Sequence, residues 1–341
     1  MSNAPSNPKG TRDFLPTELS KRNYIIDILK KNFKNFGFSE IETPALEKTS
    51  TLLGKYGNEG DRLVFKILNS GEKVKKADIN ALNSNDLKSF SKSISEKGLR
   101  YDLTVPLARY VAQHQNDLTF PFKRFQIQTV WRADRPQHGR FQEFTQCDAD
   151  VVGNNSIVQE IELIKLYDSI FSELGFNDLV FKINHRLILR GIADYIGIEN
   201  NLNEFISIID KLDKIGSDSV VDEIKQNFQD VSISKLEKLL KNKSLSFENI
   251  SLLLKDSSLA NKGIGDLKSI FDFISSKSLN NEIKFDLTLA RGLNYYTGTI
   301  LEVVSKTNTR LGSLGGGGRY DDLTSLFNMK TFLPSISAVS N

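Results

Sequence analysis

Cysteine is almost absent from this 341-residue sequence, and its scarcity restricts what the protein can be. The single cysteine, Cys147, cannot form a disulfide bond within the chain, which is typical of a reducing cytosol. The three histidines are too scattered to suggest a zinc site. No hydrophobic run reaches the length of a membrane span, and the first residues lack the pattern of a secretory signal. These features predict a cytoplasmic protein.

An excess of charge of one sign is also missing, because 45 basic and 42 acidic residues leave a net charge of only +3. Nucleic acid would therefore have to be bound by a local basic patch rather than by the chain as a whole. Hydrophobic residues make up 39% of the chain and charged residues 26%, as in ordinary globular proteins. At this length we expect a large core and more than one domain.

The stretch from Phe122 to Gly153 is the most informative part of the sequence, and we expect it to form a long β-hairpin. Polar and apolar residues alternate in both halves, with the period of two that is typical of half-buried strands. A hairpin with a solvated polar face is the simplest interpretation. The crowding of Arg132, Arg135 and Arg140 in and beside the connecting loop favours an anion site, because guanidinium groups form paired, charge-assisted hydrogen bonds with phosphate.

Two further features are ambiguous from sequence alone. Asp102 lies where a predicted strand gives way to a predicted helix, so it either caps that helix or binds a ligand, and the sequence leaves both roles open. The four consecutive glycines from Gly315 to Gly318 form either a flexible turn or a backbone that a ligand approaches closely. The residues from Arg319 to Leu326 are expected to begin a helix.

Apolar patterns predict the remaining elements. Helices are expected at residues 17–36, 104–114 and 156–174, and strands at 38–42, 62–68, 99–103, 179–184 and 284–289. Residues 71–98 are polar and are expected to form a partly helical surface segment. Residues 185–281 show successive helical patterns without the alternation of strands, which indicates a separate helical insertion.

Several motifs resemble those of one family, the histidyl-tRNA synthetases, which are class II aminoacyl-tRNA synthetases. FQIQTVWRADRPQHGRFQEFTQCDAD is similar to the second class II motif of that family. PKGTRDFLP, GFSEIETPALE, RGLNYYTG and GGGRYD resemble its entry segment, its first class II motif, its second histidine signature and the floor of its amino-acid pocket. The resemblance implies an α+β fold with a class II synthetase-like antiparallel sheet flanked by helices and a helical insertion, which either contacts tRNA or is only a solvated subdomain.

The resemblance also implies an activity, histidine–tRNA ligation, with histidine, ATP and tRNA(His) as substrates, Mg²⁺ beside the ATP, and a homodimer as the assembly. Arg132 would hold the α-phosphate, Arg140 would reach the polyphosphate, and Arg291 would bridge carboxylate and α-phosphate. The implied histidine contacts are Asp102, Thr104 and Gln146 for the α-ammonium, and Asp150, Tyr295 and Tyr296 for the imidazole, above a floor of Gly316, Gly317 and Gly318. Asp150 replaces the family's frequent glutamate, and Asn294 its usual aspartate.

The resemblance ends near residue 327, and no arginine follows Arg319. We therefore expect a chain truncated before the family's third motif, without its anticodon-binding domain and impaired in activity. Length favours an alternative, the synthetase-like regulatory subunit of ATP phosphoribosyltransferase, whereas the retained arginines favour the ligase; an inactive fragment is the third possibility. The expected domains are a discontinuous catalytic domain at 1–184 and 282–330, a helical insertion at 185–281 and an unassigned tail at 331–341.

Overall fold

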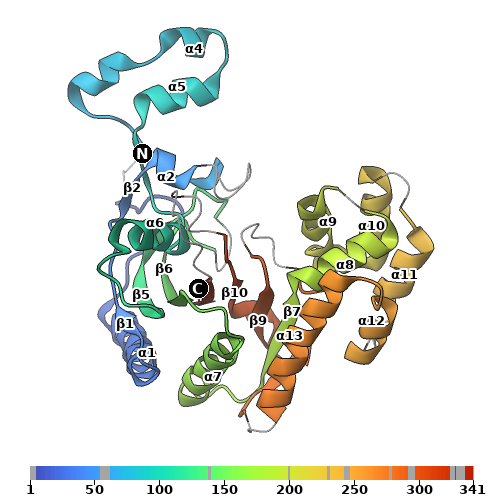
Figure 1. Cartoon of the computed structure of the whole chain (residues 1–341). Helices are drawn as coiled ribbons and strands as arrows, with labels where there is room; N and C mark the ends of the chain where they lie inside the picture. The colour runs from blue at the N-terminus through green and yellow to red at the C-terminus, as the bar shows by residue number, and fades with distance from the viewer. Residues whose placement is uncertain are drawn as a thin grey trace. The chain divides into compact units, whose positions relative to one another are not determined.

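A computed structural model describes residues 5–53, 62–136, 140–198, 200–228, 231–241, 246–275, 279–290, 296–322, 327 and 335–340 (Figure 1). Residues 213, 214, 241 and 335–340 are described by their backbone alone. The chain forms two compact units, one built mainly on Met1–Ala149 and the other on Asp150–Asp322 with Leu333–Ser340. In the described part of the chain, no helix combines the length and apolar character needed to cross a membrane.

The first unit is centred on the predicted hairpin, which forms as β5 (Phe122–Trp131) and β6 (Glu143–Val152). Strand β1 (Ser39–Glu40) pairs in parallel with β5, so that Ser39 lies opposite Arg124. Helix α1 (Pro16–Asn35) buries Ile28 and Phe33, and the rings of Phe33 and Phe125 stack with their centroids 4.9 Å apart. Hydrophobic packing of α1 therefore holds the hairpin that carries the predicted phosphate-binding arginine.

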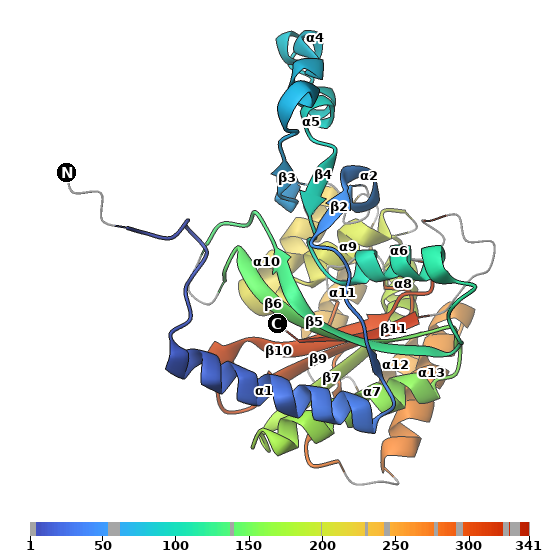
Figure 2. The same cartoon turned by 90° about the vertical axis from the view of Figure 1, so that its left-hand side faces the viewer.

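A small second sheet in this unit joins β2 (Leu46–Lys48), β4 (Lys97–Leu99) and β3 (Lys66–Ile67) in that order. Its strands are connected by α2 (Thr49–Leu52), η1 (Gly71–Lys76), α4 (Ile79–Asn83) and α5 (Leu87–Ile94). Helix α6 (Thr104–His114) follows β4 and leads to β5. Helices α4 and α5 project from the strands of this small sheet (Figure 2). The expected strand at 62–68 is limited to two residues, and the polar segment at 71–98 is partly helical as predicted.

The second unit contains the strand order β11 (Ser335–Ser340), β10 (Ser313–Arg319), β9 (Thr299–Ser305), β7 (Leu179–His185) and β8 (Glu282–Phe285). Strands β7 and β8 are parallel, whereas β9 is antiparallel to both β7 and β10. The sheets are therefore mixed rather than wholly antiparallel. Helix α7 (Val158–Glu173) packs on this sheet, where the Tyr167 hydroxyl donates to the Gly316 carbonyl over 3.2 Å. Helices and mixed sheets together confirm the α+β class.

The glycine run is a strand and not a turn. Gly316, Gly317 and Gly318 are hydrogen-bonded between β9 and β11, opposite Glu302, Leu301 and Ile300 on the β9 side. The helix predicted to start at Arg319 is wrong at that residue, because Arg319 ends β10. Tertiary pairing on both sides overrides the weak strand preference of glycine here.

Helices follow one another along the described residues between 186 and 275. They are α8 (Arg186–Ile196), α9 (Leu202–Ile209), α10 (Leu212–Asn227), α11 (Ile233–Lys241), α12 (Phe247–Leu253) and α13 (Ser258–Ser275). Helices α8 and α13 pack closely because Gly191 leaves room for Ala260: a Cβ at position 191 would lie 2.6 Å from the Cβ of Ala260. The helical character agrees with the expected insertion, while the boundaries of the three expected domains stay a prediction. Residues 335–340, inside the unassigned tail, form β11.

Candidate active site

Asp102 lies at the start of α6 and is almost fully buried. Its Oδ1 accepts a hydrogen bond from the Val105 amide over 3.1 Å, so the capping role is present. The chain between β4 and Asp102 is held against the end of β5, because the Trp131 amide donates to the Arg100 carbonyl over 3.0 Å. A carboxylate fixed in this way has a defined position, which a ligand-binding role would also need.

Two other residues of the first unit that are predicted to contact histidine have buried polar atoms without hydrogen-bond partners among the described residues. Thr104 Oγ1 and Gln146 Oε1 are shielded from solvent and make no hydrogen bond with any described residue. The amide nitrogen of Gln146 donates to Asp148 Oδ2 over 3.3 Å, which orients its side chain and leaves the oxygen as the unused acceptor. A buried acceptor without a donor costs about 1–3 kcal/mol unless a ligand satisfies it.

Arg132 follows the last residue of β5 and is half-buried. Its Nε donates to the Tyr101 carbonyl over 3.2 Å. The guanidinium carbon lies 4.5 Å from the ring centroid of Tyr101 and 5.1 Å from that of Phe144. No carboxylate of a described residue forms an ion pair with it. The rings and the carbonyl thus hold the group in place while its charge is left for an anion.

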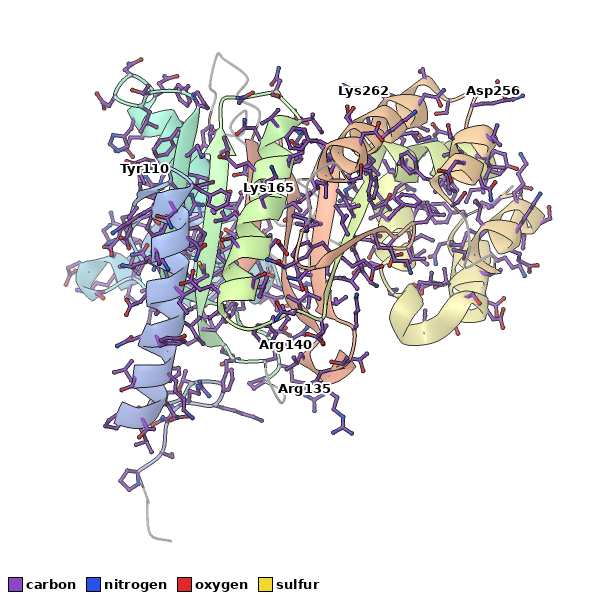
Figure 3. All side chains as sticks on the ribbon, turned by 90° about the horizontal axis from the view of Figure 1, so that it is seen from below. Tyr110, Arg135, Arg140, Lys165, Asp256 and Lys262 are labelled. Carbon is purple, nitrogen blue, oxygen red and sulfur yellow. The ribbon has the colours of Figure 1, made fainter. Side chains whose placement is uncertain are left out.

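Arg140 has a different setting. Its Nη1 lies 3.1 Å from Asp134 Oδ2, and its side chain is 61% exposed. Figure 3 labels Arg140 and Arg135, which both come from the connection between β5 and β6 and carry exposed side chains. An exposed ion pair of this kind is weak and easily exchanged, so Arg140 can change partner at little cost.

In the second unit, Asp150 is fully buried near the end of β6. The hydroxyl of Tyr320 donates to its Oδ1 over 2.5 Å. The motifs pair Asp150 with Tyr296 and assign no role to Tyr320, although Tyr320 directly follows the glycine run and Arg319. That position next to a suspected pocket floor was the available signal.

Tyr296 is also buried, and its ring rests on the glycine strand. A Cβ at Gly318 would lie 2.7 Å from Cδ1 of Tyr296 and 2.7 Å from the Thr299 carbonyl oxygen, so only glycine fits there. The absence of a side chain at Gly318 therefore makes room for the ring of Tyr296, and not only for a ligand. Gly316 and Gly317 lie in the same strand and are buried.

Arg186, at the first turn of α8, is a second residue that sequence reasoning missed. Its Nη1 donates to the Ala290 carbonyl over 3.4 Å. Burial lowers the pKa of Arg186 to about 10, and the nearby Tyr296 and Asp210 act in the opposite direction. Asn184 adds bonds from its Nδ2 to the carbonyls of Leu287 and Leu289, over 3.1 and 2.9 Å. Both side chains fix the segment that leads toward RGLNYYTG, and no local pattern in the sequence marks them.

Arg319 is neutralised by the protein itself. Its Nε and Nη2 lie 2.7 and 2.8 Å from the two carboxylate oxygens of Glu160 in α7. Burial would lower the pKa of Arg319, but the contacts with Glu160 and Asp321 raise it above its usual value. Arg319 therefore stays charged and is committed to a structural partner.

Arg291 and Tyr295 lie outside the described residues. Nowhere in the described ranges do three or more His, Cys, Asp or Glu side chains gather as ligands for a cation such as Mg²⁺. The described residues thus do not form a cation cage of their own.

Comparison with known proteins identifies the family. A model of the histidyl-tRNA synthetase family matches residues 81–332. The histidine–tRNA ligase of Christiangramia forsetii is 52% identical over 335 residues, which is 97% of this chain and 74% of that protein. The histidine–tRNA ligase of Flavobacterium johnsoniae is 50% identical over the same shares of the two chains.

Solved structures agree. The crystal structure of histidyl-tRNA synthetase from Nostoc sp. PCC 7120 superposes with a TM-score of 0.79 at 29% identity, covering 98% of this chain and 73% of that one. A structure from Bacillus halodurans, described as an ATP phosphoribosyltransferase regulatory subunit/histidyl-tRNA synthetase, shares the fold at 23% identity and a TM-score of 0.76, covering 98% of this chain and 80% of that one. Through its motifs, its sequence relatives and its fold, this chain belongs to the histidyl-tRNA synthetase family.

Proposed function

We propose that this protein is a histidine–tRNA ligase. In the first step, a carboxylate oxygen of histidine attacks the α-phosphorus of ATP, the bond to the bridging oxygen breaks, and pyrophosphate leaves. In the second step, a hydroxyl at the 3′ end of tRNA(His) attacks the carbonyl carbon of histidyl-adenylate and releases AMP. Such reactions depend on positioning and on stabilising charge at phosphorus, and they need no covalent enzyme intermediate.

The observation that carries the proposal is the state of Arg132. Its guanidinium is fixed by two aromatic rings and one carbonyl, and no described carboxylate neutralises it. A positive charge held in this way is suited to an α-phosphate whose negative charge grows in the transition state. We propose that Arg140 exchanges Asp134 for the polyphosphate, and that Arg291 bridges the carboxylate and the α-phosphate. Mg²⁺ is proposed to arrive with ATP.

The α-ammonium of histidine is proposed to bind Asp102, Thr104 and Gln146. An ammonium group offers N–H donors, and Thr104 Oγ1 and Gln146 Oε1 are buried acceptors that lack described donors. Satisfying both atoms at once would recover the free energy that their burial costs. This supports an amino-group site rather than a purely structural role for Thr104 and Gln146.

The imidazole is proposed to bind Asp150 and Tyr296, with Tyr295 beside them and Gly316, Gly317 and Gly318 beneath. Neutral imidazole has one N–H donor and one acceptor nitrogen, so it needs one acceptor and one donor from the protein. A carboxylate and a phenol provide that pair. The hydroxyl of Tyr320 donates to Asp150 and would keep this aspartate, which is shorter than the family's frequent glutamate, in its orientation. A pocket that bonds both nitrogens rejects apolar amino acids, because they would leave buried polar groups unpaired.

The test is histidine-dependent exchange of labelled pyrophosphate into ATP. We expect exchange with histidine and none with leucine or phenylalanine. Absence of exchange above background with histidine would reject the ligase. A regulatory subunit would bind histidine without catalysing exchange, so the exchange assay separates the two candidates. If exchange is absent, calorimetric titration with histidine separates a regulatory subunit, which binds histidine, from an inactive fragment, which does not. The ligase relatives at about 50% identity favour exchange.

We also propose that the protein acts in the cytoplasm as a homodimer. Several large apolar side chains of α1 and the residue before it are exposed: Leu15, Leu19, Tyr24 and Ile25. Exposed apolar side chains of this kind are typical of a protein interface, and a second copy of the chain is the proposed partner. The double change Leu19→Glu with Ile25→Glu should give a monomer in sedimentation analysis. Leu311→Glu, which alters an exposed leucine in η2, is the control and should leave the dimer intact.

A further inference from the structure

The ion pair between Glu160 and Arg319 is deeply buried, with 1% and 12% of the two side chains exposed. Both carboxylate oxygens of Glu160 meet nitrogen atoms of the guanidinium, over 2.7 and 2.8 Å. This two-bond geometry fixes direction as well as distance. Helix α7 is thereby tied to the end of strand β10.

Arg319 lies between two tyrosine-bearing segments. Directly before it is Gly318, against which the ring of Tyr296 rests. Directly after it is Tyr320, whose hydroxyl donates to Asp150. The aliphatic part of Arg319 also fills the space beside Gly298, where a Cβ would lie 2.9 Å from Cδ of the arginine.

A second set of bonds closes around the same arginine. The Thr297 amide donates to the Arg319 carbonyl over 2.7 Å. The Thr297 hydroxyl donates to Asp321 Oδ2 and accepts from the Asp321 amide, each over 3.1 Å. Asp321 Oδ1 lies 3.5 Å from Nη1 of Arg319. The residue that follows Tyr296 and the residue that follows Tyr320 are therefore both tied to Arg319.

We infer that Glu160 and Arg319 are positioning residues for the imidazole pocket: they set the places of Tyr296 and Tyr320 without touching the substrate. The inference rests on the function proposed above, since the two tyrosines select a substrate only if histidine binds there. A misplacement of about 1 Å in such a pocket can cost up to about a hundredfold in rate, so a rigid support has a large effect. Loss of the support should weaken histidine binding while ATP binding is spared.

The first test is Glu160→Gln, which keeps the shape of the side chain and removes its charge. In pyrophosphate exchange with histidine and ATP varied separately, we expect the KM for histidine to rise about tenfold, and the KM for ATP to change by less than about twofold. Glu47→Gln is the matched control, because Glu47 is likewise buried and paired with Arg109 Nε, over 2.9 and 3.0 Å. It should lower the melting temperature in a similar way and leave the KM for histidine unchanged.

The second variant is Arg319→Lys, which keeps the positive charge and so leaves Glu160 paired. A lysine cannot reproduce the two parallel bonds, and we expect the KM for histidine to rise about three- to fivefold. If the Glu160→Gln protein does not fold, the KM for histidine of Arg319→Lys tests the inference in its place. An unchanged KM for histidine in a folded variant, or an equal rise in Glu47→Gln, would overturn the inference. If the wild-type chain shows no exchange, the proposed ligase function fails instead, and histidine affinities measured by calorimetry make the same comparison of variants.

Discussion

Strands β5 and β10 each have an arginine at their end, and the surroundings of these two arginines are opposite in kind. Arg132, just after β5, is held by aromatic rings and a carbonyl, and no described carboxylate neutralises it. Arg319, the last residue of β10, is locked onto buried Glu160. The same side chain after a strand is thus available to an anion in one place and committed to the fold in the other. The partner of an arginine, rather than its place in a motif, indicates its role.

Arg132→Ala should have the largest effect and would test the first half of this comparison directly. Removing one group that stabilises transition-state charge typically costs about 10²- to 10³-fold in rate, and we expect that loss in pyrophosphate exchange. Thermal unfolding should change little, because no described carboxylate loses its counter-charge. For Arg319→Ala we expect the opposite, a larger effect on the stability of the fold than on the exchange rate, because breaking a buried ion pair costs about 3–5 kcal/mol. Similar stability losses in the two variants would remove the distinction.

Gly318→Ala should have the next largest effect, on the β10 side. The added Cβ would lie 2.7 Å from both the Thr299 carbonyl oxygen and the Tyr296 ring, and one of these atoms belongs to the backbone and cannot move easily. Overpacking of this kind costs about 1–3 kcal/mol, and the displaced Tyr296 should raise the KM for histidine about tenfold.

Gly265→Ala is the control for this change, because nothing lies within 4 Å of a Cβ at that position in α13. Alanine is the better helix former, so this variant should be more stable by about 0.5–1 kcal/mol, with unchanged kinetics. Melting temperatures and histidine titrations of both variants make the check. A stable Gly318→Ala protein with normal histidine kinetics would show that the strand does not support the tyrosine.

The sequence was informative where a local pattern decides the structure. The period of two in residues 122–152 predicted β5 and β6, and the apolar stripe near the N-terminus predicted α1 to within one residue at each end. The motifs gave the family and a set of candidate residues. The contact between Tyr320 and Asp150 could not be derived in this way, because 170 residues separate the two and only strand pairing defines the register.

The dependence on contacts between distant residues also explains two other differences between the sequence-based expectations and the structure. Four glycines have little intrinsic preference for a strand, and only hydrogen bonding from β9 and β11 makes them one. Arg186 reads as an ordinary residue near the start of a helix, and its burial beside Ala290 depends on a segment about a hundred residues away. Local periodicity predicts elements, whereas the partners of polar side chains follow from tertiary contacts that the periodicity does not contain.

Tyr320→Phe should have a moderate effect that sharpens the picture at the end of β10. It removes only the hydroxyl that donates to Asp150, a bond with a net worth of about 1 kcal/mol, so the KM for histidine should rise about fivefold. Tyr110→Phe is the control, because the Tyr110 ring stacks on Phe122 with centroids 6.3 Å apart and keeps that contact without its hydroxyl. Equal histidine kinetics in the two variants would mean that Asp150 needs no help from Tyr320.

The smallest expected effect concerns a third basic residue, Lys182, whose Nζ lies 3.0 Å from Oδ2 of Asp286. Both side chains are only partly exposed. Burial would raise the pKa of Asp286, but hydrogen bonds from Thr288 and Lys182 outweigh it and hold the pKa below its usual 3.8. Because the folded state favours the charged carboxylate, its stabilising contribution is present above that usual value and is lost as the pH falls below it. Asp286→Asn should therefore melt about 2 °C below the wild type at pH 7, with the gap closing as the pH falls below 3.8. A gap that stays constant down to pH 3 would mean that Asp286 acts through its shape and hydrogen bonds and not through its charge.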